Sequence, residues 1–160
     1  MPSLITSAWA AWGAANLAAT DNYAAADLAG AIVKLGIRVP HTARTAESLG
    51  TEREGSGVLI DDAGHILTIG YLLLEAESIL VITADGRVLP AAVAGFDHAT
   101  GFGLVRVAQP LDHPPIAIGN SNAVYELNTV AVAAHAGAGG WSHACLVKRR
   151  QFTGWWEYAL

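Results

Sequence analysis

Charged residues and cysteine are scarce in this chain of 160 residues. Aspartate and glutamate number 14 and lysine and arginine only 9, which gives a net charge of -5. The one dense basic cluster is at positions 148–150. Because nucleic acids and anionic membranes are bound through extended basic surfaces, this balance argues against both as partners. The single cysteine, Cys145, excludes an intramolecular disulfide and is expected to be a small buried apolar residue.

A long uninterrupted apolar run is also missing. No stretch of about 18 strongly apolar residues occurs, so no membrane-spanning helix is expected. Residues 1–20 contain no charged side chain, but they lack a basic n-region, and Ser7, Gly13 and Asn16 interrupt the apolar residues. This is not typical of a secretory signal, so a soluble cytoplasmic protein is slightly favoured over a periplasmic one.

Metal and phosphate motifs are absent as well. The six histidines, at 41, 65, 98, 113, 135 and 143, show neither His-x-His nor His-Glu-x-x-His spacing, and His65 is expected to be solvent-exposed. In the glycine-rich segment 137–140, the third glycine of Gly-x-Gly-x-x-Gly would fall on Ser142. The sequence therefore predicts no metal and no cofactor.

Hydrophobic residues make up 52% of the chain, which indicates a folded domain. Residues 1–30 are alanine-rich, and the spacing of Trp9 and Trp12 predicts a helical arm that docks its tryptophans on a neighbouring surface.

Short apolar runs separated by turn residues follow this arm and predict strands. The expected strands are Ile32–Val39, Gly57–Ile60, His65–Thr68, Ser78–Thr83, Arg87–Val93 and Gly103–Val107, with a polar loop over 41–54. Asp61–Gly64 and Ala84-Asp85-Gly86 are the turns of two hairpins. Many short strands without a long helix beyond the arm predict an all-β fold, a sandwich or a barrel.

A proline-rich segment, Gln109 to Pro115, cannot lie inside a strand ladder and is expected to be a linker. The predicted organisation is an N-terminal arm over 1–30, a closed antiparallel β-barrel over 31–108, the linker over 109–115 and a partial second barrel over 116–160. Strands are expected at Thr129–Ala134 and Ala144–Lys148. Two strands are too few to close a barrel, so self-association through this part is possible.

A series of motifs in one order resembles the HtrA branch of the trypsin-like serine proteases. They are Gly55-Ser56-Gly57-Val58-Leu59-Ile60-Asp61, Gly64-His65-Ile66-Leu67-Thr68, the segment 78–83, Asp85-Gly86-Arg87, Gly95-Phe96-Asp97, Gly103-Leu104-Val105-Arg106-Val107 and Ile118-Gly119-Asn120-Ser121. The resemblance implies a trypsin-like fold whose first barrel is complete and whose second is only begun.

The resemblance also locates the catalytic positions of the family. Its histidine follows a Thr-x-x-His pattern, which in Thr68-Ile69-Gly70-Tyr71 puts Tyr71 at that position. Its aspartate precedes a segment matched here by Phe102-Gly103-Leu104, so Gly101 takes its place, and its serine would lie beyond Leu160. None of the three catalytic groups is therefore expected, and Tyr71 is expected to bury its ring with its hydroxyl at the cleft.

Several functions remain open at this point. An inactive homologue would bind peptides or proteins or have a structural role. A purely structural partner, whose half-barrel is completed by another chain, is a separate hypothesis. An active serine endopeptidase would need its nucleophile in a C-terminal part outside this sequence. A further alternative, an α/β-hydrolase elbow at Gly140-Trp141-Ser142-His143-Ala144, lacks the downstream acid and separate histidine of that fold.

Overall fold

The computed structural model describes residues 29–135 and 141–150, and β-strands dominate it. A helical turn at 29–31 leads into the first strand, while the rest of the predicted N-terminal arm, 1–28, lies outside the described residues. The strands are β1 (Ile32–Arg38), β2 (Glu52–Leu59), β3 (His65–Ile69), β4 (Ser78–Ile82), β5 (Val88–Phe96), β6 (Phe102–Val107), β7 (Thr129–Ala133) and β8 (Trp141–Cys145). Short helices are α3 (Ala46–Leu49), η2 (Gly70–Leu73) and η3 (Ser121–Ala123).

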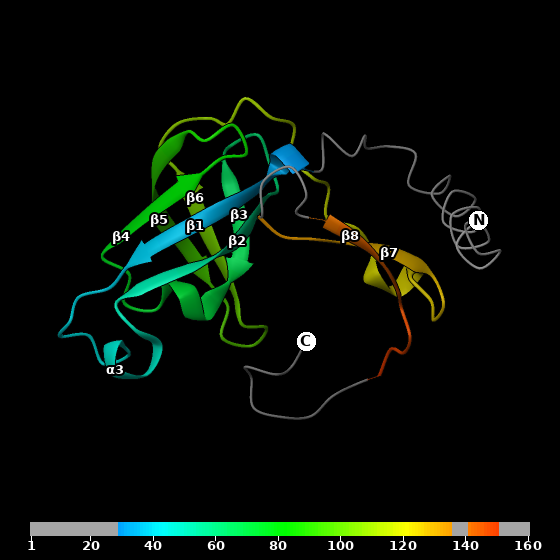
Figure 1. Cartoon of the computed structure of the whole chain (residues 1–160), viewed down its shortest axis with the longest axis horizontal. Helices are drawn as coiled ribbons and strands as arrows, with labels where there is room; N and C mark the ends of the chain where they lie inside the picture. Colours follow the sequence, from blue (N-terminus) through cyan, green and yellow to red (C-terminus); the bar gives the residue numbers. More distant parts are fainter. Residues whose placement is uncertain (1–28, 136–140, 151–160) are drawn as a thin grey trace, which may run out of the picture.

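Six of these strands close into an antiparallel barrel in the order β1-β2-β3-β6-β5-β4 (Figure 1). The barrel closes at β1, because this strand pairs with β2 along one edge and with β4 along the other. Closure leaves no free strand edge, which is the expected solution for a small all-β domain. The prediction of an all-β fold with a closed antiparallel barrel is confirmed.

Strand limits differ from the prediction at β2, β5 and β8. The loop predicted over 41–54 contains α3 and ends early, because Glu52, Arg53 and Glu54 pair with the second half of β1. The inward-facing residue of this half of β2 is Arg53 rather than an apolar residue, so an interpretation based on apolar runs misses the strand. Strand β5 continues to Phe96, past the predicted end at Val93, and β8 spans Trp141–Cys145 rather than the predicted Ala144–Lys148.

The barrel interior is filled by aliphatic side chains that alternate along each strand. The completely or almost completely buried ones include Val33, Leu35, Leu59, Ile66, Leu72, Val81 and Val105. Gly57 faces this interior from β2, and a Cβ there would lie 2.4 Å from Cγ2 of Ile66. Glycine at this position therefore sets how closely β1, β2 and β3 pack.

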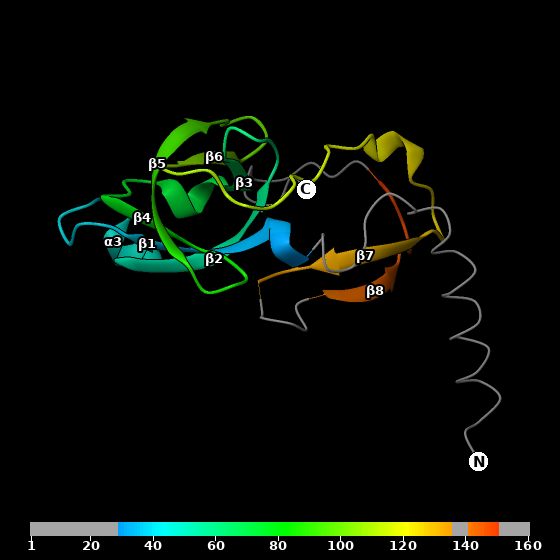
Figure 2. The same ribbon diagram turned by 90° about the horizontal axis from the view of Figure 1, so that it is seen from above.

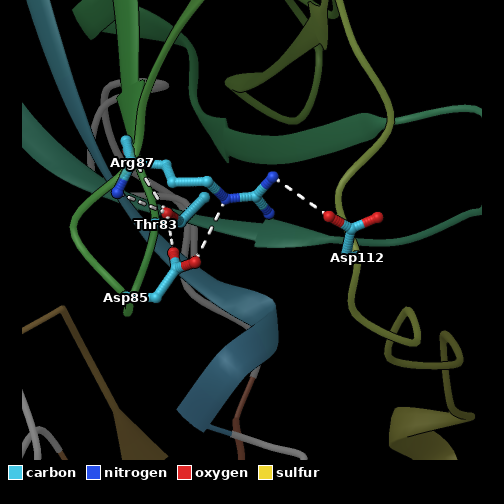
Figure 3. A network of polar contacts seen from close by, with 4 residues as sticks. All are labelled: Thr83, Asp85, Arg87 and Asp112. Carbon is cyan, nitrogen blue, oxygen red and sulfur yellow. Dashed lines mark hydrogen bonds and ion pairs between the residues drawn. The ribbon is translucent and has the colours of Figure 1, made fainter.

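The proline-rich segment after β6 runs along the barrel without forming a strand. Ile116 N–H donates to the Leu59 carbonyl over 2.9 Å, and a Cβ on Gly30 would collide with the His113 ring. The β4–β5 turn holds the same segment, because Arg87 donates to Asp85 and to Asp112, each over 3.1 Å (Figure 3). Thr83 in turn hydrogen-bonds the Asp85 carboxylate, which is the main cause that lowers the pKa of Asp85. The exact domain boundaries stay a prediction.

Strands β7 and β8 form a separate two-stranded antiparallel sheet beside the barrel (Figure 2). Within the described part of the chain, no other strand pairs with their outer edges. Cys145, at the end of β8, is exposed, so the expectation that it is buried is wrong. It lies on a hairpin with no covering layer among these residues. No helix of the described residues is long and apolar enough to cross a membrane.

We expect Gly57→Ala to lower the free energy of unfolding by about 1–3 kcal/mol, because the new methyl group overpacks the barrel interior. Gly36→Ala is the matched control: Gly36 lies on the adjacent strand β1, with open space where its Cβ would be. That change should be neutral or slightly stabilising. Urea unfolding of both variants measures the difference, and equal stability of the two would contradict the packing argument.

Candidate functional site

Two segments meet at one end of the barrel. One is η2, which follows β3 and carries Tyr71; the other is the turn between β5 and β6, which carries Gly101. Gly70 N–H donates to the Gly101 carbonyl over 2.7 Å. The two positions that the family resemblance assigned to histidine and aspartate are thus on segments in direct backbone contact, although 30 residues apart in sequence.

Glycine is required for this contact. A Cβ on Gly70 would lie 2.3 Å from Cε2 of Phe96 and 2.8 Å from the Gly101 oxygen. A Cβ on Gly103 would lie 2.6 Å from Cδ1 of Leu73 and 3.1 Å from Cα of Gly70. Real side chains do not approach this closely, so the segments could not pack in this way with larger residues.

The turn at Gly101 has a conformation of its own. Gly101 is buried and has φ +74°, a left-handed value that other L-residues adopt only with strain. Asp97 closes the turn by accepting hydrogen bonds from Thr100 Oγ1 at 2.7 Å and from Ala99 N at 2.9 Å, and these bonds lower the pKa of Asp97. An aspartate at 101 would add the missing carboxylate in a left-handed conformation, which aspartate adopts more readily than most L-residues.

Helix η2 is anchored by its last two residues. Leu72 and Leu73 are buried in the core, whereas Tyr71 is 38% exposed. The expectation that Tyr71 has a buried ring therefore overstates its burial. Tyr71 is an accessible aromatic side chain on a rigidly held turn.

A buried arginine binds η2 through hydrogen bonds. Arg53, on β2, is only 5% exposed, and its Nη1 donates to the carbonyls of Tyr71 at 3.1 Å and Leu74 at 2.9 Å. Its Nε donates to the Gly50 carbonyl at 3.3 Å and its Nη2 to Thr45 Oγ1 at 2.7 Å. A buried guanidinium must have hydrogen-bond partners, and here it donates to the Leu74 carbonyl and is a second donor for the Tyr71 carbonyl, which also accepts from Leu74 N–H over 3.4 Å.

Glu75 continues this network on the surface. Its carboxylate accepts hydrogen bonds from Thr45 Oγ1 at 2.7 Å, Thr45 N at 2.8 Å and Arg44 N at 3.0 Å. These bonds, with Thr45 the largest cause, lower the pKa of Glu75. The contribution to stability is therefore present above the usual glutamate pKa and is lost as pH falls through the lowered value. Glu75 also has φ +57°, which this network stabilises.

We call η2 and the β5–β6 turn at Gly101 the corner of the barrel. The other candidate residues lie outside this corner. Ser142 is inside β8, opposite Val132, and an elbow serine needs a sharp strand-to-helix turn, so the α/β-hydrolase alternative is wrong. His65 is partly buried and pairs with Asp61 over 2.6 Å, which corrects the expectation of a solvent-exposed ring. Among the residues described, no three histidine, cysteine, aspartate or glutamate side chains gather as a metal site would require.

Sequence reasoning missed Arg53, Thr45 and Glu75. Arg53 was read as part of a polar loop, and no local pattern marks an arginine that turns inward. The hydrogen bonds that define its role join residues 18 and 21 positions apart, which only the barrel brings together.

Comparison with known proteins finds one family model, described as a trypsin-like peptidase domain, over residues 55–157. Serine endoprotease DegS of Escherichia coli K12 is 33% identical over 79 residues, 49% of this chain and 22% of DegS. A probable periplasmic DegP-like serine endoprotease of Pseudomonas fulva is 32% identical over 88 residues, 52% of this chain and 18% of its own. The chain thus spans about a fifth of the length of these relatives.

Solved structures with a similar fold include the HtrA-type protease AlgW with a tripeptide. Two AlgW structures align with TM-scores of 0.65 and 0.59 at 20% and 19% identity. The alignments cover 79% and 74% of this chain, and 40% and 36% of the solved chains. At this identity the likeness shows a shared fold.

We expect Arg53→Met to lower the free energy of unfolding by about 2–4 kcal/mol, because it leaves buried carbonyls and Thr45 without their charged donor. Arg106→Met is the control, since Arg106 is an exposed arginine on β6. Hydrogen exchange should also accelerate in η2 in the Arg53 variant before the barrel strands unfold. Unchanged exchange in residues 70–75 would contradict the role given to Arg53.

Proposed function

Because the chain belongs to the trypsin-like, HtrA-type serine protease family, we propose that it is a proteolytically inactive member that binds peptide or protein segments. The single observation that carries this proposal is the identity of the residues at the family's histidine and aspartate positions, Tyr71 and Gly101. Peptide hydrolysis needs a base that takes the proton of the nucleophile and a carboxylate that orients this base. A phenol is a poor base at neutral pH compared with an imidazole, and glycine has no side chain.

The backbone contact between η2 and the β5–β6 turn supports this reading. The 2.7 Å hydrogen bond between Gly70 and Gly101 joins the two segments closely enough for side chains of a histidine and an aspartate to meet. The two segments are thus close enough for such a pair, but Tyr71 and Gly101 do not supply its chemical groups.

A firmly held site that lacks catalytic groups is better suited to binding a ligand than to catalysis. The corner is held by the buried Arg53, by the core residues Leu72 and Leu73, and by glycines that permit close packing. Its accessible side chain, Tyr71, is of a type enriched in protein interfaces. A rigid turn that presents a tyrosine loses little conformational entropy when a ligand binds.

The alternative is an active serine endopeptidase whose nucleophile lies in a C-terminal part outside this sequence. The relatives are named as serine endoproteases, which favours activity for those proteins. For this chain it would require a base at a place other than the family's histidine position.

A structural role through self-association is a second candidate. Large apolar side chains are exposed in the β7–β8 part, among them Leu127 (70%), Val132 (56%) and Val147 (80%). Exposed apolar side chains beside unpaired strand edges favour association. A mass above that of one chain in light scattering, lowered by Val132→Asp, would support this candidate.

We expect the purified protein to leave fluorescein-labelled β-casein uncleaved and to remain unlabelled by a fluorophosphonate probe, because no base activates a serine at the family site. The measurements are fragment release on gels and the mass of the intact chain after labelling. Ser142→Ala controls for reaction at Ser142. Labelling that disappears in Ser142→Ala, or cleavage by the wild type, would overturn the inactive assignment.

We expect labelled β-casein nevertheless to bind, and Tyr71→Ala to weaken its affinity about tenfold, which corresponds to about 1.4 kcal/mol. Tyr125→Ala is the matched control, since Tyr125 is a more exposed tyrosine outside the corner. Fluorescence anisotropy gives both affinities. If both variants bind as the wild type does, or if no binding occurs, the corner is not the binding surface.

A further inference from the structure

The outer wall of the barrel carries an apolar strip over β4 and β5. Residues directly opposite each other in an antiparallel pair share one face, so Ile82 lies beside Val88 and Leu80 beside Pro90. Ala92 continues the outward row on β5, and Leu80 and Val88 are 45% and 56% exposed. We call this surface the β4–β5 strip: Leu80, Ile82, Val88, Pro90 and Ala92.

An apolar outer strip is unusual for a barrel whose interior already forms the core. Antiparallel strands with one solvated face usually place polar side chains outward. The neighbouring wall follows that rule, since Lys34 on β1 forms an ion pair with Glu54 on β2 over 2.7 Å. Next to the strip, Gly36 lies opposite Leu80 and has no atom within 4 Å of its Cβ position. The strip is therefore open beside Leu80, while Lys34 lies opposite Ile82.

Positive charge flanks the strip on both sides. Arg38 lies on β1, opposite Ser78, and Arg106 lies on β6, opposite Ala92. Among the described residues, no carboxylate lies within ion-pair distance of either guanidinium. Arg87, at the end of the strip, differs because it already pairs with Asp85 and Asp112 (Figure 3). An occupant of the strip should be apolar with a surplus of acidic residues.

The described part of the chain does not supply such an occupant. Sheet β7–β8 lies on the other side of the barrel from β4 and β5 in both views (Figures 1 and 2). The occupant must therefore be another part of this chain or another molecule.

Residues 1–28 have the required composition. They contain no lysine, arginine or glutamate; their only charged side chains are Asp21 and Asp27, and they carry Trp9 and Trp12. Covalent attachment gives such a segment a high effective concentration at the strip, which a separate partner lacks.

The segment 1–28 is also long enough to reach the strip. It joins the structure at residue 29, and Leu80 lies beside Gly36, seven residues further along the chain and therefore at most about 23 Å away. Trp12 precedes residue 29 by 17 positions, which spans about 25 Å even as a helix. We propose that residues 1–28 dock on the β4–β5 strip of their own chain and cover it. The proposal does not depend on the peptide-binding function.

Hydrogen exchange of the full chain tests this docking. Amides in residues 1–28 should exchange about tenfold more slowly in the wild type than in Leu80→Asp, because the carboxylate makes the strip unsuitable for an apolar segment. Leu49→Asp is the matched control: Leu49, on α3, is a leucine of similar exposure (39%) outside the strip. The control should retain the protection, and exchange in β1 to β6 should stay slow in both variants. Val88→Asp repeats the test if Leu80→Asp disturbs the barrel.

Two outcomes would overturn the proposal. One is equal exchange of residues 1–28 in the wild type and in Leu80→Asp with the barrel intact. The other is protection that disappears on dilution together with a dimer seen by light scattering, which would make a second copy the occupant. A covalent check uses Trp12→Cys with Leu80→Cys in a Cys145→Ser background. Docking predicts an intramolecular disulfide in the monomer, and its absence under oxidising conditions would count against it.

Discussion

Closure of the barrel through β1 is the constraint on which the rest of this structure depends. One strand of seven residues pairs along its whole length with β2 and over five residues with β4. This pairing removes the free edges of the sheet, and it fixes which side chain of every strand faces inward. The interior is then narrow enough that Gly57 cannot gain a methyl group without moving Ile66.

The candidate site follows from the same closure. Strands β3 and β6 pair in register, with Ile69 opposite Phe102. The segment that follows β3 and the segment that precedes β6 must therefore run side by side. Contact between Gly70 and Gly101 is a consequence of this pairing, and the buried Arg53 stabilises the turn on one side. The barrel thus brings together the two positions that the resemblance assigns to the catalytic histidine and aspartate, whatever residues occupy them. A protein of this family can lose catalytic side chains without losing the surface around them, which is the basis of the binding function proposed above.

The two proposals concern different surfaces of the molecule and rest on different physics. Peptide binding depends on a rigid corner that presents an aromatic side chain, and its strength would come from preorganisation. Docking of residues 1–28 depends on an apolar surface between two arginines, and its strength would come from burial of that surface and from tethering. Each can hold without the other. The exposed apolar residues of β7 and β8 form a third surface, for which self-association is the candidate role.

Much of the barrel was predictable from the sequence, because alternating apolar residues and the turns at Asp61–Gly64 and Ala84–Gly86 are local signals of hairpins. The order of motifs also placed Tyr71 and Gly101 at positions of interest. The early start of β2 was not predictable, since its inward-facing residue there is the charged Arg53 and its pairing partner is distant in sequence. The inward position of Arg53, the backbone conformation of Gly101 and the apolar row across β4 and β5 were decided by tertiary structure. Each depends on the register between strands, which brings together residues that no sequence window contains.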